Sequence, residues 1–171
     1  MGNKEKKKYN IPEPKEQLVS TIQGLSKYRI GDLNVDFHDI LKLKPIFAFD
    51  YVSLNNEELC FNCGDLETKD YIGLIEGLKK VSALTYSELD KQKAFRFHVV
   101  NFDDKRVSIT RDQFRSLLTT RPELLPDDQL PTLYQFDLQY IREARVCGFI
   151  FRGVFYLIWY DRNHIIYPQK K

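Results

Sequence analysis

Long apolar runs, charge of one sign and cysteine are all scarce in this sequence. No apolar run reaches the ~18 residues of a membrane-spanning helix, so we expect no membrane partner. The formal net charge is only +2, too small to indicate a nucleic-acid-binding protein by itself. There are three cysteines, and the first residues lack the basic-then-apolar pattern of a signal peptide. Together these absences predict a protein of the reducing cytoplasm.

What is present is the composition of an ordinary globular protein. Apolar residues make up 43% of the chain and charged residues 29%, which excludes a wholly disordered chain and provides material for one hydrophobic core. Residues 1–12 are rich in lysine, and we expect a disordered basic tail there. Residues 13–171 are then expected to form a single domain.

The first half of the sequence predicts two helices with a pair of strands between them. Pro14 suits the first turn of a helix, and apolar residues follow it at helical spacing. Residues 46–63 predict two strands around a turn at Asn55. Thr68 is expected to cap the next helix. The buried stripe of that helix is predicted to be Tyr71, Leu74, Ile75, Leu78 and Val81.

Two capping boxes predict further short helices. Thr85 is followed three residues later by Glu88, and Thr110 in the same way by Gln113. In such a box the side chains of both residues bond to each other's backbone N–H groups.

Alternating or continuous apolar residues predict strands in the second half. The segment 94–100 alternates, with Phe95, Phe97 and Val99 on its inner face. The segment 133–140 alternates more cleanly. Its inward side chains are expected to be Tyr134, Phe136, Leu138 and Tyr140, and its outward ones Gln135, Asp137 and Gln139.

The last strands form a hairpin in this interpretation. Arg152 and Gly153 predict a tight turn, and residues 154–160 are apolar at every position, which is typical of a central strand covered on both faces. Asp161-Arg162-Asn163 is turn chemistry, and residues 164–168 would be a short final strand. The predicted fold class is α+β, with helices packed on a mostly antiparallel, meander-like sheet.

Cys60 and Cys63 form a CxxC pair that raises the question of zinc. A Cys3His site could be assembled from these two, Cys147 and one histidine, but nothing in the spacing requires it. We favour buried cysteines, and we expect neither a metal nor another cofactor. His38 and His98 are interpreted as surface or packing histidines.

The terminal segment 145–168 is the strongest candidate for a site. His164 follows a buried strand, near Asp161, Arg162 and Tyr167, where a histidine could exchange protons near neutral pH. The alternative is that His164 caps the turn through a hydrogen bond with Asp161.

The same segment has features that permit an RNA or acidic partner. Residues 132–171 contain six Lys or Arg against three Asp or Glu, so the basic excess of the chain lies here. Aromatic rings beside arginines can stack on bases, although most of these rings are expected in the core. The candidate binding residues are Arg152, Tyr160, Asp161 and Arg162.

Three strings resemble a widespread bacterial family of small, mostly uncharacterised proteins. They are FAFDYVSLNNEELCFNC, LTYSEL and RVCGFIFRGVFYLIWYDRNHIIYP, and the resemblance covers roughly residues 45–168. The last string, with its RxxGF and FYLIWxDxNH elements, is the most specific. The resemblance implies a shared fold and brings no activity.

The expected order of strands and helices is also similar to RelE/ParE-type toxins of toxin–antitoxin systems. For the RelE-like branch the resemblance implies a metal-free ribonuclease whose catalytic residues would be Arg145, His164 and Tyr167. Arg145 or Arg162 would stabilise the phosphorane, and His164 and Tyr167 would transfer protons. This chain is longer than those toxins, with an extra strand and helix expected near 94–120.

Two functions therefore follow from the sequence. We favour a non-enzymatic protein–protein interaction module, and the alternative is the toxin, with an antitoxin, RNA or the ribosome as partner. Exposure separates them, because a catalytic His164 and Tyr167 must share an open surface with Arg145 or Arg162. In an interaction module, Arg145 would pair with Asp161 or Glu143.

Overall fold

The computed structural model of the protein describes most of the chain from residue 37 onward. The described residues are 37–54, 58–62, 64, 66–139 and 144–168. The expected tail at residues 1–12, the start of the domain at residue 13 and the first predicted helix lie outside these ranges. No helix within the described ranges is long and apolar enough to cross a membrane.

A five-stranded mixed sheet forms the centre of the fold. In spatial order its strands are β1 (Ile46–Ala48), β5 (Val154–Asp161), β4 (Arg145–Phe151), β3 (Leu133–Asp137) and β2 (His98–Val99). Strands β2 to β5 form an antiparallel meander, but β1 pairs with β5 in parallel. The predicted sheet type is therefore correct only in part, because alternation within a segment shows its faces and not the direction of its neighbour.

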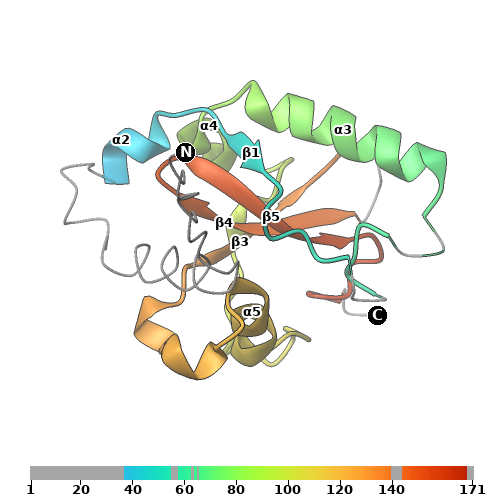
Figure 1. The fold of residues 1–171 in the computed structure, drawn as a ribbon. Helices are drawn as coiled ribbons and strands as arrows, with labels where there is room; N and C mark the ends of the chain where they lie inside the picture. The colour runs from blue at the N-terminus through green and yellow to red at the C-terminus, as the bar shows by residue number, and fades with distance from the viewer. Residues whose placement is uncertain (1–36, 55–57, 63, 65, 140–143, 169–171) are drawn as a thin grey trace, which may run out of the picture.

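Helices cover both faces of the sheet (Figure 1). On one face lie α2 (Phe37–Leu41), α3 (Thr68–Ser82) and α4 (Tyr86–Lys91). On the other lies α5 (Arg111–Leu118), which is followed by the 3-10 turns η1 (Pro122–Leu124) and η2 (Asp127–Gln129). Each face has its own hydrophobic cluster, so the expectation of α+β architecture is confirmed.

The continuous apolar segment lies inside the sheet, as predicted. Within β5, Phe155 and Leu157 belong to the cluster under α3, while Trp159 belongs to the cluster over α5. This strand is covered on both faces, although the middle strand of the five is β4.

Both capping boxes are present as predicted. The Glu88 N–H donates to Thr85 Oγ1 (3.2 Å), and the Thr85 N–H donates to Glu88 Oε2 (2.7 Å). At the start of α5, the Gln113 N–H donates to Thr110 Oγ1 (3.2 Å) and the Thr110 N–H to Gln113 Oε1 (2.7 Å). These exchanges satisfy N–H groups that have no partner inside a helix.

The predicted start and buried stripe of α3 both need correction. The helix begins at Thr68 itself, and the residue before it, Glu67, donates its N–H to Asp70 Oδ2 (2.9 Å). Tyr71 and Ile75 are 42% and 60% exposed. The buried residues are Asp70, Gly73, Leu74, Gly77, Leu78 and Val81.

The glycines explain this rotation of α3. A Cβ on Gly77 would lie 2.6 Å from Leu138 Cδ2, so the helix approaches the sheet more closely than any larger residue would allow. A prediction from apolar side chains alone omits Gly73 and Gly77. It therefore places the buried face of the helix at a different angle from the face that is buried in the structure.

Two predicted strands are shorter or covered differently than expected. In the segment 94–100 only His98 and Val99 are paired, because Arg96 has a φ of +43° and interrupts the extended backbone. Val99 is consequently 47% exposed. In β3, Gln135 is buried although it was predicted to face water, because the α5 layer covers that second face.

Two other predicted strands are absent from the described residues. After β1, residues 49–54 and 58–62 form bends and turns and not the second strand predicted there. Residues 164–168 are not a strand either. They are held by the 101–108 loop, where the Ser108 N–H donates to Ile166 O (3.1 Å) and Ser108 Oγ donates to Ile165 O (2.9 Å).

The β4–β5 hairpin has the predicted two-residue turn and also an irregularity. Arg152 and Gly153 both have positive φ, +51° and +81°, as a tight hairpin turn of this kind requires. Cys147 lies opposite Trp159, but Gly148 lies opposite Leu157, so one residue of β5 bulges out of the ladder.

Gly148 is the residue that this bulge requires. A Cβ at this position would lie 2.1 Å from the carbonyl oxygen of Tyr156, a backbone atom that moves only if the hairpin opens. We therefore expect Gly148→Ala to lower the free energy of unfolding by about 3 kcal/mol, the upper end of overpacking costs, in denaturant unfolding. Gly64→Ala is the control, because a Cβ there meets nothing within 4 Å. Equal stability of the two variants would contradict this role.

Candidate functional site

Arg145 lies at the start of β4 and is almost completely buried, with 4% of its surface exposed. Its neighbours across the sheet are Asp137 on β3 and Asp161 on β5. The guanidinium forms an ion pair with Asp137, and its Nη1 donates to Ala144 O (3.1 Å). A row of alternating charge, buried at Arg145 and Asp161 and partly buried at Asp137, thus crosses three strands at one end of the sheet.

Burial changes the acid–base properties of this row. Burial lowers the pKa of the Arg145 guanidinium, and the nearby charge of Arg96 acts in the same direction. Burial raises the pKa of the Asp161 carboxyl. Each charge is costly in this environment without the others, so the row is a structural unit and Arg145 faces carboxylates and not solvent.

Asp161 organises the turn that contains His164. Its Oδ1 accepts from the Ile165 N–H (2.7 Å) and its Oδ2 from the Ile166 N–H (2.9 Å). His164 is partly buried and has a φ of +56°. The Asp161 carboxylate therefore caps this turn through the backbone N–H groups of the two residues that follow His164.

Arg162 connects this turn to the start of α3. Its Nε donates to Asp70 Oδ1 (2.6 Å), and Asp70 is 1% exposed. Burial tends to raise the pKa of Asp70, but the Glu67 N–H and the Arg162 guanidinium outweigh it and lower that pKa. This pair fixes the first turn of α3 against the end of β5.

Tyr160 and Arg152 occupy very different places. Tyr160 is 1% exposed, its ring stacks on Phe61 at 5.6 Å between centroids, and burial raises its pKa. Arg152 is exposed in the hairpin turn at the opposite end of β4 from Arg145, with its guanidinium 5.2 Å from the centre of the Phe151 ring. The structure therefore does not gather the predicted binding residues on one surface.

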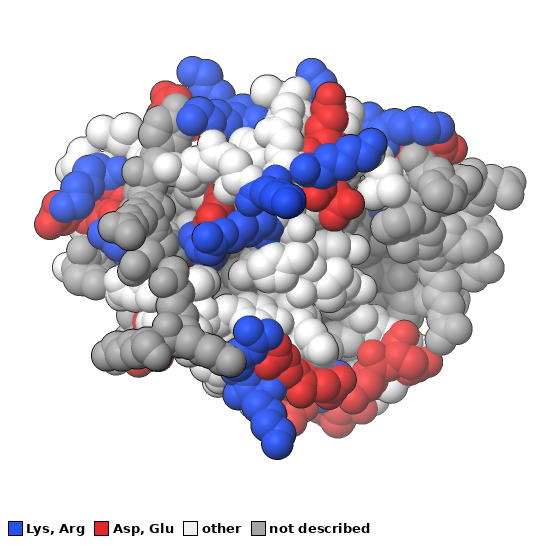
Figure 2. All heavy atoms as spheres, turned by 180° about the vertical axis from the view of Figure 1, so that it is seen from behind, with Lys and Arg blue, Asp and Glu red and all other residues white. Residues whose placement is uncertain are grey.

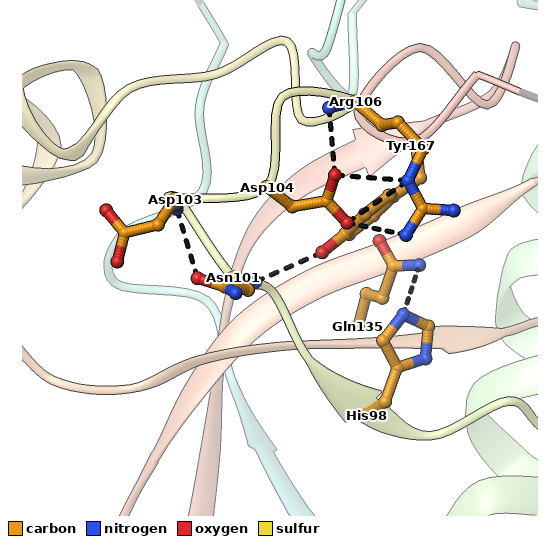
Figure 3. Close-up of polar contacts among 7 residues, drawn as sticks. All are labelled: His98, Asn101, Asp103, Asp104, Arg106, Gln135 and Tyr167. Carbon is orange, nitrogen blue, oxygen red and sulfur yellow. Dashed lines mark hydrogen bonds and ion pairs between the residues drawn. The ribbon is translucent and has the colours of Figure 1, made fainter.

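Tyr167 lies in a polar cluster at the β2 edge of the sheet (Figure 3). Its hydroxyl accepts from the Asn101 N–H (3.1 Å), and the Arg106 guanidinium lies 5.8 Å from the centre of its ring. Arg106 is held in turn by Asp104, with Nε donating to Oδ1 at 3.1 Å. The phenol thus ties the end of the chain to the 101–106 turn.

His98 is the histidine that the structure brings to Tyr167, with ring centroids 5.8 Å apart (Figure 3). Its Nδ1 lies 2.6 Å from Arg96 O and its Nε2 lies 3.1 Å from Gln135 Nε2. A neutral ring satisfies both contacts if Nδ1–H donates and Nε2 accepts. In that tautomer both ring nitrogens have hydrogen-bond partners within the protein.

Sequence reasoning missed this cluster. His98, Asn101 and Arg106 are 61 to 69 positions before Tyr167, and no motif connects them. The cluster depends on the register that places His98 opposite Gln135. This register is set by the fold and cannot be read from the local alternation of apolar and polar residues.

The basic residues around α5 are matched by acids. Ion pairs join Arg111 to Asp103 (2.8 Å) and Arg115 to both Asp112 and Asp127. Figure 2 shows the rear face, where Lys and Arg side chains lie close to Asp and Glu side chains around an uncharged central area. Such mixed charge differs from the basic stripe that is typical of nucleic-acid-binding surfaces.

The cysteines do not form a visible metal site. Cys60 and Cys147 are buried free thiols, and burial raises the pKa of Cys147 well above its ordinary value. Cys63 lies outside the described residues. Among the residues that are described, no group of three or more potential ligands is placed to hold a metal ion.

Comparisons with protein families, with curated proteins and with solved structures find no match for this chain. The two resemblances, one from sequence motifs and one from the order of strands and helices, therefore stay predictions.

The burial of Arg145 gives a direct test of its role. Arg145→Ala should lower the free energy of unfolding by about 3–5 kcal/mol, because the buried Asp161 would lose the cation beside it and Asp137 would keep only its ion pair with the exposed Arg96. Arg106→Ala is the matched control, since its guanidinium is 59% exposed and its surface ion pair should contribute about 1 kcal/mol or less. Chemical denaturation measures both. An Arg145→Ala protein as stable as Arg106→Ala would contradict a structural role.

The lowered pKa of Asp70 predicts acid sensitivity. In the folded state this carboxyl binds its proton less readily than in the unfolded state, where its pKa is about 3.9. Its stabilising contribution is therefore present above that value and is lost as the pH falls through the folded pKa. Asp70→Asn should be less stable than wild type at pH 7, and the difference should shrink below about pH 4. Asp90→Asn, at an exposed position of α4, is the control for unfolding curves between pH 7 and 3.

Proposed function

We propose that this protein is a non-enzymatic protein–protein interaction module that binds a protein partner through the outer face of α3. The observation that carries the proposal is the exposure of three large apolar side chains on two turns of one helix. Tyr71, Ile72 and Ile75 are 42%, 59% and 60% exposed.

The spacing of these residues makes them one surface. Ile72 and Ile75 are three apart and Tyr71 and Ile75 four apart, so their side chains are neighbours on the helix. Glu76 and Lys79 form an exposed ion pair beside them, 3.9 Å between Nζ and Oε1. Apolar patches rimmed by charged residues are typical of protein interfaces, whereas single exposed apolar residues are ordinary.

The terminal segment supports a module without catalysis. Arg145, Asp161 and Arg162 each contact an element of the fold and thereby hold the β4–β5 hairpin, the following turn and α3 together. A buried polar network stabilises a fold when every group in it has a partner, because an unpaired buried polar group is costly. We infer a cytoplasmic protein in which this segment is part of the scaffold.

The ribonuclease alternative is less well supported by the geometry. It needs an arginine that can reach a phosphorane, and Arg145 lies buried between two carboxylates. The histidine whose ring packs against Tyr167 is His98, which was not the predicted proton-transfer partner, and both of its ring nitrogens have hydrogen-bond partners.

Photo-crosslinking tests the α3 surface directly. A benzoylphenylalanine at Tyr71, introduced in the cells that make the protein, should crosslink to one protein partner. Ile72→Asp and Ile75→Asp in the same chain should each reduce that product at least about tenfold, because a charge would be buried in the interface. Crosslinked species are identified by mass spectrometry, and circular dichroism checks that the variants are folded.

The same crosslinker at exposed Asp90 of α4 is the control. A Tyr71 product no stronger than the Asp90 product, or one unchanged by both aspartates, would contradict the interface. Growth arrest on expression that is abolished by His164→Ala/Tyr167→Phe, with the α3 variants still toxic, would favour the ribonuclease.

A further inference from the structure

Within the part of the chain that the structure describes, the sheet has two edge strands, β1 and β2, and they differ in what they offer to another strand. Strand β2 has only two paired residues. Arg96, with its positive φ, precedes it, and a turn follows it in which the Asp103 N–H donates to Asn101 Oδ1 (3.0 Å). Bends of this kind at both ends are a known protection of an edge against further pairing.

The β1 edge is apolar. Ile46 is 67% exposed and Phe49 is 56% exposed, and no charged residue lies between Pro45 and Phe49. Charge returns directly at the two ends of this stretch, as exposed Lys44 before it and exposed Asp50 after it. An exposed apolar edge strand is a template for pairing with another strand.

The charges at the two ends make this stretch complementary to itself. Two copies related by a two-fold axis would pair their β1 strands antiparallel, because such an axis reverses the strand direction. With the axis at Phe47, residue 46 lies opposite residue 48, and Pro45 lies opposite Phe49. In the same register Lys44, two residues before β1, lies nearest the partner's Asp50, which begins the turn two residues after β1. Opposite charges that face each other across a sheet stabilise the pairing.

We propose that the protein forms a two-fold dimer through antiparallel pairing of the β1 edges, in which Lys44 of each copy contacts the partner's Asp50. The two sheets then form one continuous sheet of ten strands. The ring of Phe49 and the side chain of Ile46 are covered where they are now exposed.

The register is set by these residues. A slip of one residue would place Lys44 opposite Phe49 and leave both charges without a counterpart. Pro45 has no N–H to donate, so pairing stays short and the dimer dissociates on dilution. Glu88 is an acid of the same copy that lies near this lysine; its pKa is lowered mainly by the hydrogen bonds from Thr85 and less by Lys44.

Charge reversal tests the register. Sedimentation of the full chain over a series of concentrations should show a monomer–dimer equilibrium. Lys44→Asp and Asp50→Lys should each raise the dissociation constant about tenfold or more, since like charges then face each other twice per dimer. The double variant Lys44→Asp/Asp50→Lys restores the attraction with reversed signs, and its dissociation constant should return to within about threefold of wild type.

A disulfide provides a second measurement. In this register Ile46 of one copy lies opposite the partner's Ala48, at a Cα separation of about 4.5–5.5 Å that a disulfide can span. Ile46→Cys/Ala48→Cys should therefore give a covalent dimer on oxidation, while Ile46→Cys alone should give no more than wild type. A chain that stays monomeric at every concentration, or a double charge variant as weak as the single ones, would overturn the proposal. Neither result bears on the Tyr71 crosslink, so this inference and the proposed function can fail separately.

Discussion

The fold depends on the burial of one guanidinium, that of Arg145, between β3 and β5. A cation in this position is tolerated only with carboxylates beside it, and the neighbouring strands supply Asp137 and Asp161. Because Asp161 also accepts the N–H groups of Ile165 and Ile166, the same charge that balances Arg145 determines the course of the chain after β5. Electrostatics and backbone direction are thus coupled at one end of the sheet.

This coupling changes how the polar residues of the terminal segment are understood. In the sequence, Arg145, Asp161, Arg162 and Tyr167 resemble the components of an active site, since they are polar groups close to buried strands. In the structure each of them joins two elements, such as Arg162 to α3 or Tyr167 to the 101–106 turn. Exposed large apolar residues lie on α3 and along β1, and also at Leu43, Leu54, Val99 and Leu124.

Patterns carried by consecutive residues were predictable, and contacts between distant ones were not. The Thr85 and Thr110 caps and the turn at Gly153 depend on neighbours, and all were predicted. The predicted buried face of α3 was wrong because Gly77 packs against Leu138, and helical periodicity alone does not reveal this contact. For the candidate site, the sequence predicted which kinds of side chain are present but not their surroundings. The burial of Arg145 and the approach of His98 to Tyr167 arise from the order of the strands.

The parallel pairing of β1 has a consequence for synthesis of the chain. Ile46 pairs with Val154, and the whole meander lies between them in sequence. A ribosome releases Ile46 and Phe47 long before it has made β5, the strand that pairs with them. During that interval both edges of β1 are open to other chains, and the synthesis of β5 closes one of them. The nascent chain therefore has its greatest need of a chaperone between the synthesis of β1 and that of β5.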